Sequence, residues 1–285
     1  MNPIISIMSQ GAMGAATASR LVENGLEVRT NLLGRGAASA ERAAKAGMKP
    51  VSDDELTGAD FLLSIVPPAE AVSLAERLSP ILARAAARKI VFVDLNAINP
   101  ETTKKVAQIV QAAGALFVDG GIIGGPPRAG YDGPAYYVSG VDAKLVEALA
   151  PFGLRIVVLD GPIGAASALK MSYAGITKGL IAISCSMILA AQRAGVSDAL
   201  YEELSTSQAA LLAGFARSVP DMFSKAYRWV AEMREISGFA GSDSAEQEIF
   251  SGVANFYARI ARDFEGHKEE VAMLRDFFPR GSKRS

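Results

Sequence analysis

A glycine-rich turn near the amino terminus has the spacing of a nucleotide-binding motif. An apolar segment at residues 4–8 runs into it, and a helical pattern follows and ends at Asn24-Gly25. The turn consists of Ser9, Gln10, Gly11, Ala12, Met13 and Gly14. In a G-x-G-x-x-G turn the middle glycine lets the backbone approach a pyrophosphate, the last lets helix and strand pack closely, and the helix amino terminus attracts the anion. Ser9 replaces the first glycine, and the strand-turn-helix context favours dinucleotide binding over a purely structural turn.

The residues after the second predicted strand indicate which dinucleotide is bound. Sites specific for NAD place Asp or Glu at this strand end to hold the ribose hydroxyls. Here the strand at residues 27–32 is followed by Leu33, Gly34 and Arg35, and the next acid is Glu41. A guanidinium group can pair with a 2′-phosphate through its planar fork. The sequence therefore favours NADP over NAD, with Gly34 and Arg35 at the cofactor.

A lysine within an apolar helical pattern is the main candidate for acid-base chemistry. Lys170 lies among small and apolar residues, and on a helix it shares one face with Tyr173 and Thr177. A partly desolvated lysine can give or take a proton near neutral pH, as the interconversion of an alcohol and a carbonyl requires. The alternative is a lysine that extends from a buried helix to solvent. The residues alone leave both hypotheses open.

Other catalytic chemistries are poorly represented in the sequence. The chain has one histidine, His267, and one cysteine, Cys185. Zinc catalysis and a disulfide framework are therefore not expected, and no metal site is predicted. His267 lies in a charged segment, which is typical of a solvated imidazole. Cys185 lies in an apolar helical pattern and is interpreted as a small buried hydrophobe.

Alternating strands and helices must position these residues. Strands are predicted at residues 4–8, 27–32, 61–66, 90–95, 115–119, 135–139 and 156–159, with Ala-rich helical patterns between them, such as 70–87 and 101–113. This alternation predicts a Rossmann-type α/β fold with a parallel, doubly wound sheet.

The pattern changes near residue 161, after which only helical periodicity is found. Helices are predicted at residues 165–194, 198–217, 220–236, 244–264 and 268–278. Gly195 is expected to end the first of them and Ser197 to cap the next. The sequence therefore predicts an NAD(P)-binding domain at residues 1–161, followed by an all-helical substrate and dimerisation domain at residues 162–285.

Charge and hydropathy limit the partners. The chain of 285 residues has 29 basic and 30 acidic residues, a net charge of −1, which argues against nucleic acid as a partner. The amino terminus lacks the basic start and long apolar core of a signal peptide, and the longest apolar run, residues 179–191, is too short to span a bilayer. We expect a cytoplasmic protein without a membrane partner, and the long apolar helix predicts a homodimer.

Several motifs resemble those of the β-hydroxyacid dehydrogenases, the family that includes 3-hydroxyisobutyrate and 6-phosphogluconate dehydrogenases. The glycine turn with Met13 before Gly14 is similar to the opening of that family. Residues 65–68 (Ile-Val-Pro-Pro) look like its cofactor loop, and residues 94–97 (Asp-Leu-Asn-Ala) look like its D-x-S-T segment. Residues 117–125 resemble its substrate motif, D-A-P-V-S-G-G, and residues 161–170 resemble the catalytic turn and lysine-bearing helix. The motifs follow the family order over residues 4–195.

This resemblance implies functions for individual residues. Lys170 would act as general acid and base, and Tyr173 is a second catalytic candidate. The cofactor loops would contribute Val66, Pro67, Pro68 and Asn96, although a turn-stabilising Asn96 is an alternative. The substrate would contact Ile123, Gly124, Gly125 and Arg228, whereas an ion pair between Arg228 and Glu232 is the simpler interpretation. Residues 225–233 resemble a branch usually labelled phosphogluconate-dehydrogenase-like, whose helical carboxyl-terminal domain has no assigned function.

The sequence departs from the family pattern at its polar positions. Ile123 stands where the family has a serine, and Ala174 stands where it usually has an asparagine after the catalytic lysine. Tyr173 replaces an asparagine or histidine, and Pro126 and Pro127 remove two backbone donors. These changes put activity on 3-hydroxyisobutyrate or 6-phosphogluconate in doubt and favour a larger or more apolar substrate.

The resulting hypothesis is an NADP-dependent oxidoreductase. It would interconvert a β-hydroxy acid, or a related alcohol or β-hydroxy amino acid, with its carbonyl form. An imine reductase-like enzyme is one alternative, but relatives with that activity usually replace the catalytic lysine, so Lys170 counts against it. A non-catalytic NADP-binding sensor or scaffold is the other alternative, which Ile123 and Ala174 favour.

Overall fold

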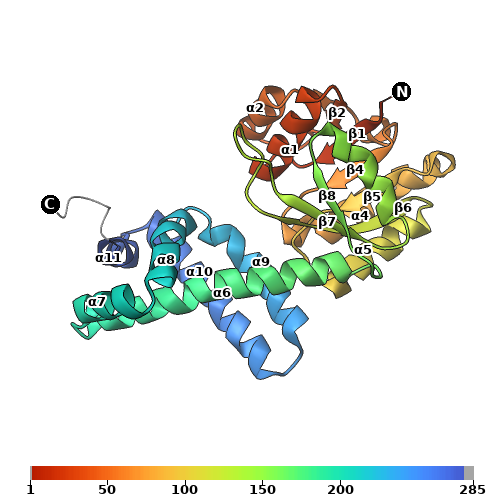
Figure 1. The fold of residues 1–285 in the computed structure, drawn as a ribbon. Helices are drawn as coiled ribbons and strands as arrows, with labels where there is room; N and C mark the ends of the chain where they lie inside the picture. Colours follow the sequence, from red (N-terminus) through yellow and green to blue (C-terminus); the bar gives the residue numbers. More distant parts are fainter. Residues whose placement is uncertain (1, 279–285) are drawn as a thin grey trace. The chain divides into compact units, whose positions relative to one another are not determined.

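A computed structural model describes residues 2–278 and divides the chain into two compact units (Figure 1). The first unit extends to Met171, and the second begins at Ser172. The boundary predicted near residue 161 precedes helix α6 (Ala165–Arg193), whereas the two units divide inside this helix. The first turns of α6 pack on the sheet of the first unit, and the rest of the helix packs within the second.

An eight-stranded sheet forms the centre of the first unit, in the order β3-β2-β1-β4-β5-β6-β7-β8. Its strands are β1 (Ile4–Met8), β2 (Glu27–Thr30), β3 (Lys49–Pro50), β4 (Phe61–Ser64), β5 (Val91–Asp94), β6 (Leu116–Ile123), β7 (Ala135–Ser139) and β8 (Arg155–Val158). The strand order reverses between β1 and β4. In open α/β sheets ligands bind beyond the carboxyl ends of the strands at such a reversal. The carboxyl ends of β1 and β4 are therefore the expected cofactor position.

The sheet confirms the predicted doubly wound α/β class and corrects parts of it. β7 runs antiparallel to β6, with Asp119 opposite Ser139, because residues 124–134 return the chain without a crossover helix. β3 was not predicted, since two residues that include Pro50 give no alternating pattern. β2 ends at Thr30, earlier than predicted, because the following residues leave the sheet and form a loop.

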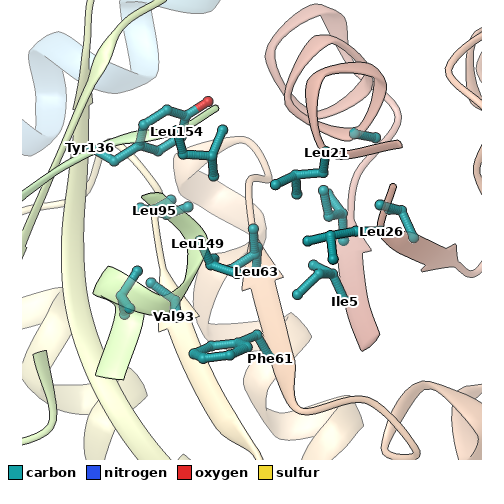
Figure 2. Packing of buried hydrophobic residues seen from close by; sticks show 14 of the residues in the cluster. Ile5, Leu21, Leu26, Phe61, Leu63, Val93, Leu95, Tyr136, Leu149 and Leu154 are labelled. Atoms are coloured by element: carbon teal, nitrogen blue, oxygen red, sulfur yellow. The ribbon is translucent and has the colours of Figure 1, made fainter. Parts of the chain in front are cut away.

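Helices cover both faces of the sheet. The first unit contains α1 (Ala12–Glu23), α2 (Ala37–Lys45), α3 (Asp53–Leu56), α4 (Ala71–Arg84) and α5 (Pro100–Ala112), with a 3-10 segment at Ala143–Phe152. On one face Ile5, Leu63 and Val93, from neighbouring strands, pack with Leu21 of α1 (Figure 2). On the other face α4 and α5 pack on alternate residues of the same strands, such as Phe92. Both faces are buried, as a parallel sheet requires.

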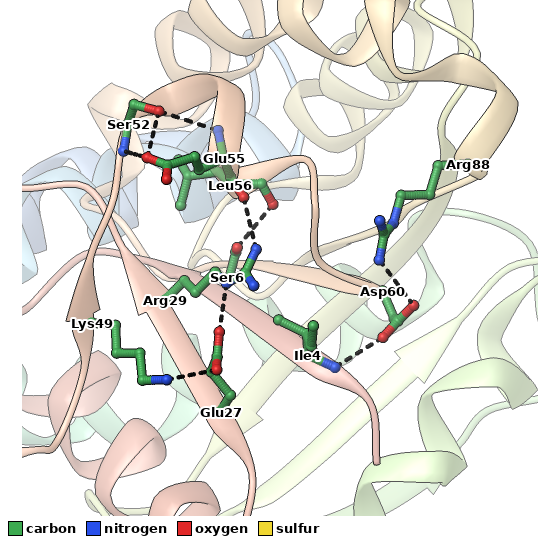
Figure 3. A network of polar contacts seen from close by, with 10 residues as sticks. All are labelled: Ile4, Ser6, Glu27, Arg29, Lys49, Ser52, Glu55, Leu56, Asp60 and Arg88. Carbon is green, nitrogen blue, oxygen red and sulfur yellow. Dashed lines mark hydrogen bonds and ion pairs between the residues drawn. The ribbon is translucent and has the colours of Figure 1, made fainter. Parts of the chain in front are cut away.

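Polar contacts tie together the amino-terminal ends of the strands, away from the expected cofactor edge (Figure 3). Glu27 accepts hydrogen bonds from Lys49 at 2.6 Å and Arg29 at 2.8 Å, and these bonds lower the pKa of Glu27. Ser52 and Glu55 form a capping box at the start of α3. The capping box follows the carboxyl end of β3 and lies near Leu32 and Leu33. The contacts of Glu27 join β2 to β3 at the amino-terminal edge, and the glycine turn follows the opposite end of β1.

The second unit is helical, as predicted. After α6 it contains α7 (Ser197–Ser207), α8 (Ala209–Met222), α9 (Ala226–Ala240), α10 (Ala245–Glu265) and α11 (Glu269–Phe277). Helices α9 and α10 form an antiparallel hairpin (Figure 1). Small residues on α6 let α10 approach, since a Cβ atom at Gly175 would lie 3.1 Å from the ring of Phe250.

The helix boundaries in this unit differ from the prediction at three points. The predicted helix at residues 198–217 is interrupted at Gln208, which has φ −138° and ψ 41°, although no glycine or proline marks the break. Pro220 lies inside α8, so the next helix starts at Ala226. Gly195 ends α6 with φ 72°, as predicted, but Val196 rather than Ser197 precedes α7, without a side-chain cap.

Among residues 2–278, one helix has the length and composition that would allow it to cross a bilayer. This helix is α6, with a mean hydropathy of 1.7 over its most apolar window, and 44% of that window is buried within the protein. The apolar segment is longer than the run at residues 179–191 considered above, because the helix extends to both sides of it. A buried core helix passes the same test, and the packing of α10 on Gly175 and Gly179 fits that explanation.

Candidate active site

The glycine turn joins β1 to α1, and its last glycine lies very close to the backbone of its first residue. A Cβ atom at Gly14 would lie 2.2 Å from the Ser9 carbonyl oxygen, so only glycine fits there. Ser9 has φ 127°, a conformation that L residues rarely adopt, and its Oγ accepts a hydrogen bond from the Gly11 amide at 3.2 Å. α1 starts after Gly11 without a side-chain cap. Its first backbone amides are therefore available to an anion such as a pyrophosphate.

Two side chains of the turn point into the protein. Gln10 is buried, and its Nε2 donates to the Thr30 hydroxyl and to the Asn31 carbonyl at the end of β2. Met13 packs against the core of the first unit. The Gln10 side chain is thus used inside the protein, and the Met13 side chain is partly buried.

Two arginines lie near the turn and the neighbouring loop. Gly34 has φ 72°, which directs the chain after β2 toward Arg35. Arg35 Nη2 lies 3.4 Å from Glu70 Oε2, just before α4. Arg42 Nε donates to the carbonyl of Gln10 at 2.7 Å. Basic groups therefore flank the carboxyl end of β2, where NAD-specific proteins have an acid.

Asn96 connects the loops after β4 and β5. Its Oδ1 accepts a hydrogen bond from the Val66 amide at 2.6 Å, and its Nδ2 donates to Ser64 Oγ at 2.8 Å. The side chain is 2% exposed. After Val66, Pro67 and Pro68 start a short 3-10 turn that precedes α4. Both polar atoms of the Asn96 side chain are used inside the protein, so the turn-stabilising interpretation is the one that the geometry supports.

Two buried acids lie opposite each other on β5 and β6. Asp94 pairs with Asp119 in the strand register. Asp94 accepts a hydrogen bond from the Asn96 amide at 2.9 Å, and burial raises the pKa of Asp94 to about 7. Asp119 accepts bonds from Ser139, Gly164, Ala166 and Ser167, which belong to β7 and the start of α6. The strand predicted at residues 115–119 ends at this acid, whereas β6 continues to Ile123, so Asp119 lies inside the strand. Its contacts were not predicted, and an acid in an apolar strand pattern was the available signal.

Lys170 lies in the second turn of α6, against β6. A Cβ atom at Gly121 would lie 2.9 Å from Lys170 Cβ and 3.1 Å from the Ala166 carbonyl oxygen. The lysine is half-buried, and the first atoms of its side chain lie over Gly121. Lys170, the predicted catalytic residue, thus packs against the strand that continues into the predicted substrate loop.

The predicted substrate loop begins at the end of β6. Ile123 is half-buried, and Gly124 has φ 129° with the Tyr131 hydroxyl 2.8 Å from the position of a Cβ atom. Gly125 is exposed and has open space around its Cα. The loop therefore requires glycine at position 124 for its conformation, while position 125 has room for a larger side chain or a ligand.

In the second unit, the predicted pair between Arg228 and Glu232 is wrong. Glu232 forms a buried ion pair with Lys178 of α6, whose Nζ also lies 4.8 Å from the centre of the Trp229 ring. Arg228 is exposed and lies over the Tyr227 ring. The side chain of Lys178 is thus largely enclosed, because α9 brings an acid and an aromatic ring over it.

Three other residues singled out by sequence have simple environments. Tyr173, the second catalytic candidate, is 49% exposed within the second unit. His267 is exposed after α10, and Cys185 is fully buried, as expected. Within residues 2–278 there is no group of three or more His, Cys, Asp or Glu side chains placed to hold a metal ion.

Comparison with known proteins identifies relatives over the whole chain. An uncharacterised 28.5 kDa protein of Methanothermus fervidus is 28% identical over 86% of this chain and 94% of its own length. The mitochondrial 3-hydroxyisobutyrate dehydrogenase of Drosophila melanogaster is 24% identical over 69% of this chain and 57% of its own length. The solved 3-hydroxyisobutyrate dehydrogenase of Mycobacterium tuberculosis, with L-serine, has a TM-score of 0.69 at 18% identity and covers 97% of this chain and 99% of its own. This last match shows a shared fold.

Two family models match consecutive parts of the sequence. Residues 191–260 match a domain of unknown function (DUF1932), which corresponds to the helical unit. Residues 5–154 match the NAD-binding domain of 6-phosphogluconate dehydrogenase, and this match covers more than half of the chain. Both matches confirm the resemblance found in the motifs. The chain therefore belongs to the family of the NAD-binding domain of 6-phosphogluconate dehydrogenase.

Proposed function

We propose that the protein is an NADP-dependent oxidoreductase that interconverts a β-hydroxy acid, or a related alcohol or β-hydroxy amino acid, with its carbonyl form. The observation that carries this proposal is the position of Lys170. Its stem rests on Gly121 of β6, and the same strand leads into the loop at Ile123, Gly124 and Gly125. The proposed proton-transfer residue therefore packs on the strand that leads into the predicted substrate loop of an NAD-binding unit.

The residues of the glycine turn fit a dinucleotide. The close approach of Gly14 to Ser9 brings the start of α1 directly against the end of β1, and the first amides of α1 have no side-chain cap. When bound, the nicotinamide cofactor exchanges a hydride with the substrate carbon. In the direction of oxidation the substrate O–H bond breaks, and Lys170 accepts that proton while the carbonyl forms. In the direction of reduction, the protonated amine returns the proton to the oxygen.

The choice of NADP rests on the groups after β2. Arg35 and Arg42 can pair with a 2′-phosphate, and Arg35 is already held in an ion pair with Glu70 at 3.4 Å. Loss of one charge-assisted contact costs about 1.5–3 kcal/mol. Arg35→Ala should therefore weaken NADP binding roughly ten- to a hundredfold and leave NAD binding nearly unchanged. Equal losses for both cofactors would show that Arg35 does not contact the 2′-phosphate.

The substrate proposal excludes a highly polar sugar acid. Each buried hydroxyl or phosphate group of 6-phosphogluconate needs a hydrogen-bond partner, and Ile123, Pro126 and Pro127 offer few. The test is an absorbance assay with NADP and a panel of β-hydroxy acids, β-hydroxy amino acids and 6-phosphogluconate. Saturable oxidation of an apolar hydroxy acid is expected. Efficient oxidation of 6-phosphogluconate, or cofactor binding with no turnover on any panel member, would contradict the proposal, and the second result would favour a sensor.

We also propose that the protein forms a homodimer through α6. Ile176, Leu180, Ile183 and Met187 are between 47% and 66% exposed and alternate at spacings of four and three residues, the pattern of a helix-packing seam. Beside them, α6 and α10 line an apolar groove of about 250 Å³ whose wall includes Gly252, a position with open space around it. A twofold interface needs such a self-complementary surface. Light scattering should find a dimer that Ile183→Asp converts to a monomer; a monomeric wild type would contradict this.

A further inference from the structure

The start of α6 is held by an acid from the sheet. Asp119 Oδ2 accepts hydrogen bonds from the amides of Gly164 at 2.9 Å, Ala166 at 2.9 Å and Ser167 at 3.2 Å. It also accepts a bond from Ser139 Oγ at 2.7 Å, and Oδ1 accepts one from Ser167 Oγ at 2.5 Å. The Asp119 side chain is fully buried. Both of its oxygens act only as acceptors, which matches the hydrogen-bonding capacity of a carboxylate.

These bonds satisfy the free amides at the helix amino terminus from outside the helix. The first turn of α6 contains no acidic residue of its own, and a negative charge at this end stabilises the helix dipole. Because Asp119 belongs to β6, the bonds fix the helix to the strand and not merely to itself. Ser167 also contacts Thr103 of α5 at 2.8 Å, which ties the same turn to a third element.

The second contact between α6 and β6 lies at Lys170. Asp119 and Gly121 are two residues apart on a strand and thus point to the same face of the sheet. Ala166 and Lys170 are four residues apart on a helix and thus lie on the same side. Asp119 holds the amide of Ala166 at 2.9 Å, and Gly121 lies directly under the Lys170 stem. Two points on each element therefore define both the position and the rotation of the helix that carries the lysine.

We propose that Asp119 is a positioning residue for proton transfer by Lys170, with Gly121 as the surface on which the lysine stem rests. The proposal relies on the proton-transfer function proposed above for Lys170. Loss of the carboxylate would let the first turn of α6 move, and a displacement on the order of 1 Å can cost about a hundredfold in rate. Asp119 touches neither substrate nor cofactor in this account and acts only through the helix.

The first test is a double-mutant cycle on turnover, with the panel member that the wild type oxidises fastest. Asp119→Asn keeps the shape of the side chain and removes its charge, and should lower kcat roughly 10- to 100-fold while the Kd of NADP stays within a few fold. Added to Lys170→Ala, it should lower kcat no further, because the residue through which it acts is gone. The positioning function would be overturned if the double variant lost kcat by the product of the two single losses. It would also be overturned if Asp119→Asn alone kept the wild-type kcat. Full turnover in Lys170→Ala would instead overturn the proposed function of the lysine.

Two controls separate positioning from a general loss of stability. Ser52→Ala removes the cap of α3 in the same unit, so it should lower the Tm without changing kcat. Amide hydrogen exchange of the segment 164–171 should accelerate in Asp119→Asn and not in Ser52→Ala. Equal exchange in wild type and Asp119→Asn would contradict the proposal even without a known substrate.

Gly121→Ala tests the second contact. The added methyl would lie 2.9 Å from Lys170 Cβ, so the lysine must shift and kcat should fall. Gly214→Ala, at a helix position with no atom within 4 Å, is the matched control and should keep kcat. Equal turnover in both variants would show that the lysine stem needs no fixed position on β6.

Discussion

Two lysines on the same helix occupy contrasting environments. Lys170 lies at the start of α6, over the backbone of Gly121, next to a turn whose amides bind Asp119. Two helical turns later Lys178 is 17% exposed, forms an ion pair with Glu232 and stacks on Trp229. In the first region, backbone amides donate hydrogen bonds to the Asp119 carboxylate. In the second region, the lysine pairs with a carboxylate. The neighbours supplied by other elements, rather than the residue type, therefore determine the environment of each lysine on this helix.

The largest predicted effect is on the Lys178 region. Lys178→Ala would leave the buried Glu232 carboxylate without its ion pair, and breaking a buried pair in this way costs about 3–5 kcal/mol. We therefore expect a large fall in the free energy of unfolding, measured by urea titration.

The matched control for that variant is the double change Lys178→Met with Glu232→Leu. It removes both charges and keeps apolar volume, so stability should recover to the wild-type value or exceed it. If Lys178→Ala were as stable as the wild type, the ion pair would not be buried in solution, and the contrast between the two lysines would be lost.

A smaller effect is predicted for Asp94, which lacks the set of amides that surrounds Asp119. Burial raises the pKa of Asp94 from 3.8 to about 7, so ionisation in the folded protein is costly, by up to about 4 kcal/mol. A raised folded-state pKa means that the folded protein binds the proton more tightly than the unfolded chain. This contribution to stability is complete below pH 4 and is lost as the pH rises toward and through 7.

Urea unfolding at pH 5, 6, 7 and 8 checks this prediction. The wild type should lose stability relative to Asp94→Asn over this range, because the asparagine cannot ionise. Parallel curves for the two proteins would show that Asp94 is ionised without cost in the folded protein.

The smallest effect is predicted at the glycine turn. Ser9 has φ 127°, and strain of this kind costs on the order of 1–3 kcal/mol. Ser9→Gly should raise the free energy of unfolding by about 1 kcal/mol, less than the full strain because glycine gains entropy in the unfolded chain. A thermal melt measures the change, and Ser19→Gly, at a half-buried position inside α1, should instead lower the Tm. A lower Tm in Ser9→Gly would mean that the bond from Gly11 to the Ser9 hydroxyl outweighs the strain.

Most of the fold followed from local patterns. β1 and β7 have the predicted bounds, and α6 ends at Gly195 as expected, because apolar strands and a helix-ending glycine are local signals. The antiparallel pairing of β7 and the break at Gln208 depend on tertiary contacts that leave no local mark. The sequence therefore predicted the elements better than their connections.

For the candidate site too, features within one segment could be predicted and contacts between distant segments could not. The glycine turn and Lys170 could be predicted as site candidates because their spacing is contained within one segment. Asp119 and the ion pair of Lys178 were missed, since each combines residues more than forty positions apart in the chain. The sequence left Asn96 as either a cofactor contact or a turn-stabilising residue. The burial of its side-chain amide favours the second interpretation.

The most direct test of the account is the turnover of Lys170→Ala beside the double variant Lys178→Met with Glu232→Leu. Both proteins lack a lysine on α6, and both are expected to fold. With NADP and the best hydroxy acid of the panel, Lys170→Ala should lose about 10² to 10⁴ in kcat, the range for a positioned proton-transfer group, while cofactor affinity stays within a few fold. The double variant should keep kcat within a few fold of the wild type. Near-normal turnover in Lys170→Ala, or a loss confined to the Lys178 variant, would contradict the assignment of proton transfer to Lys170.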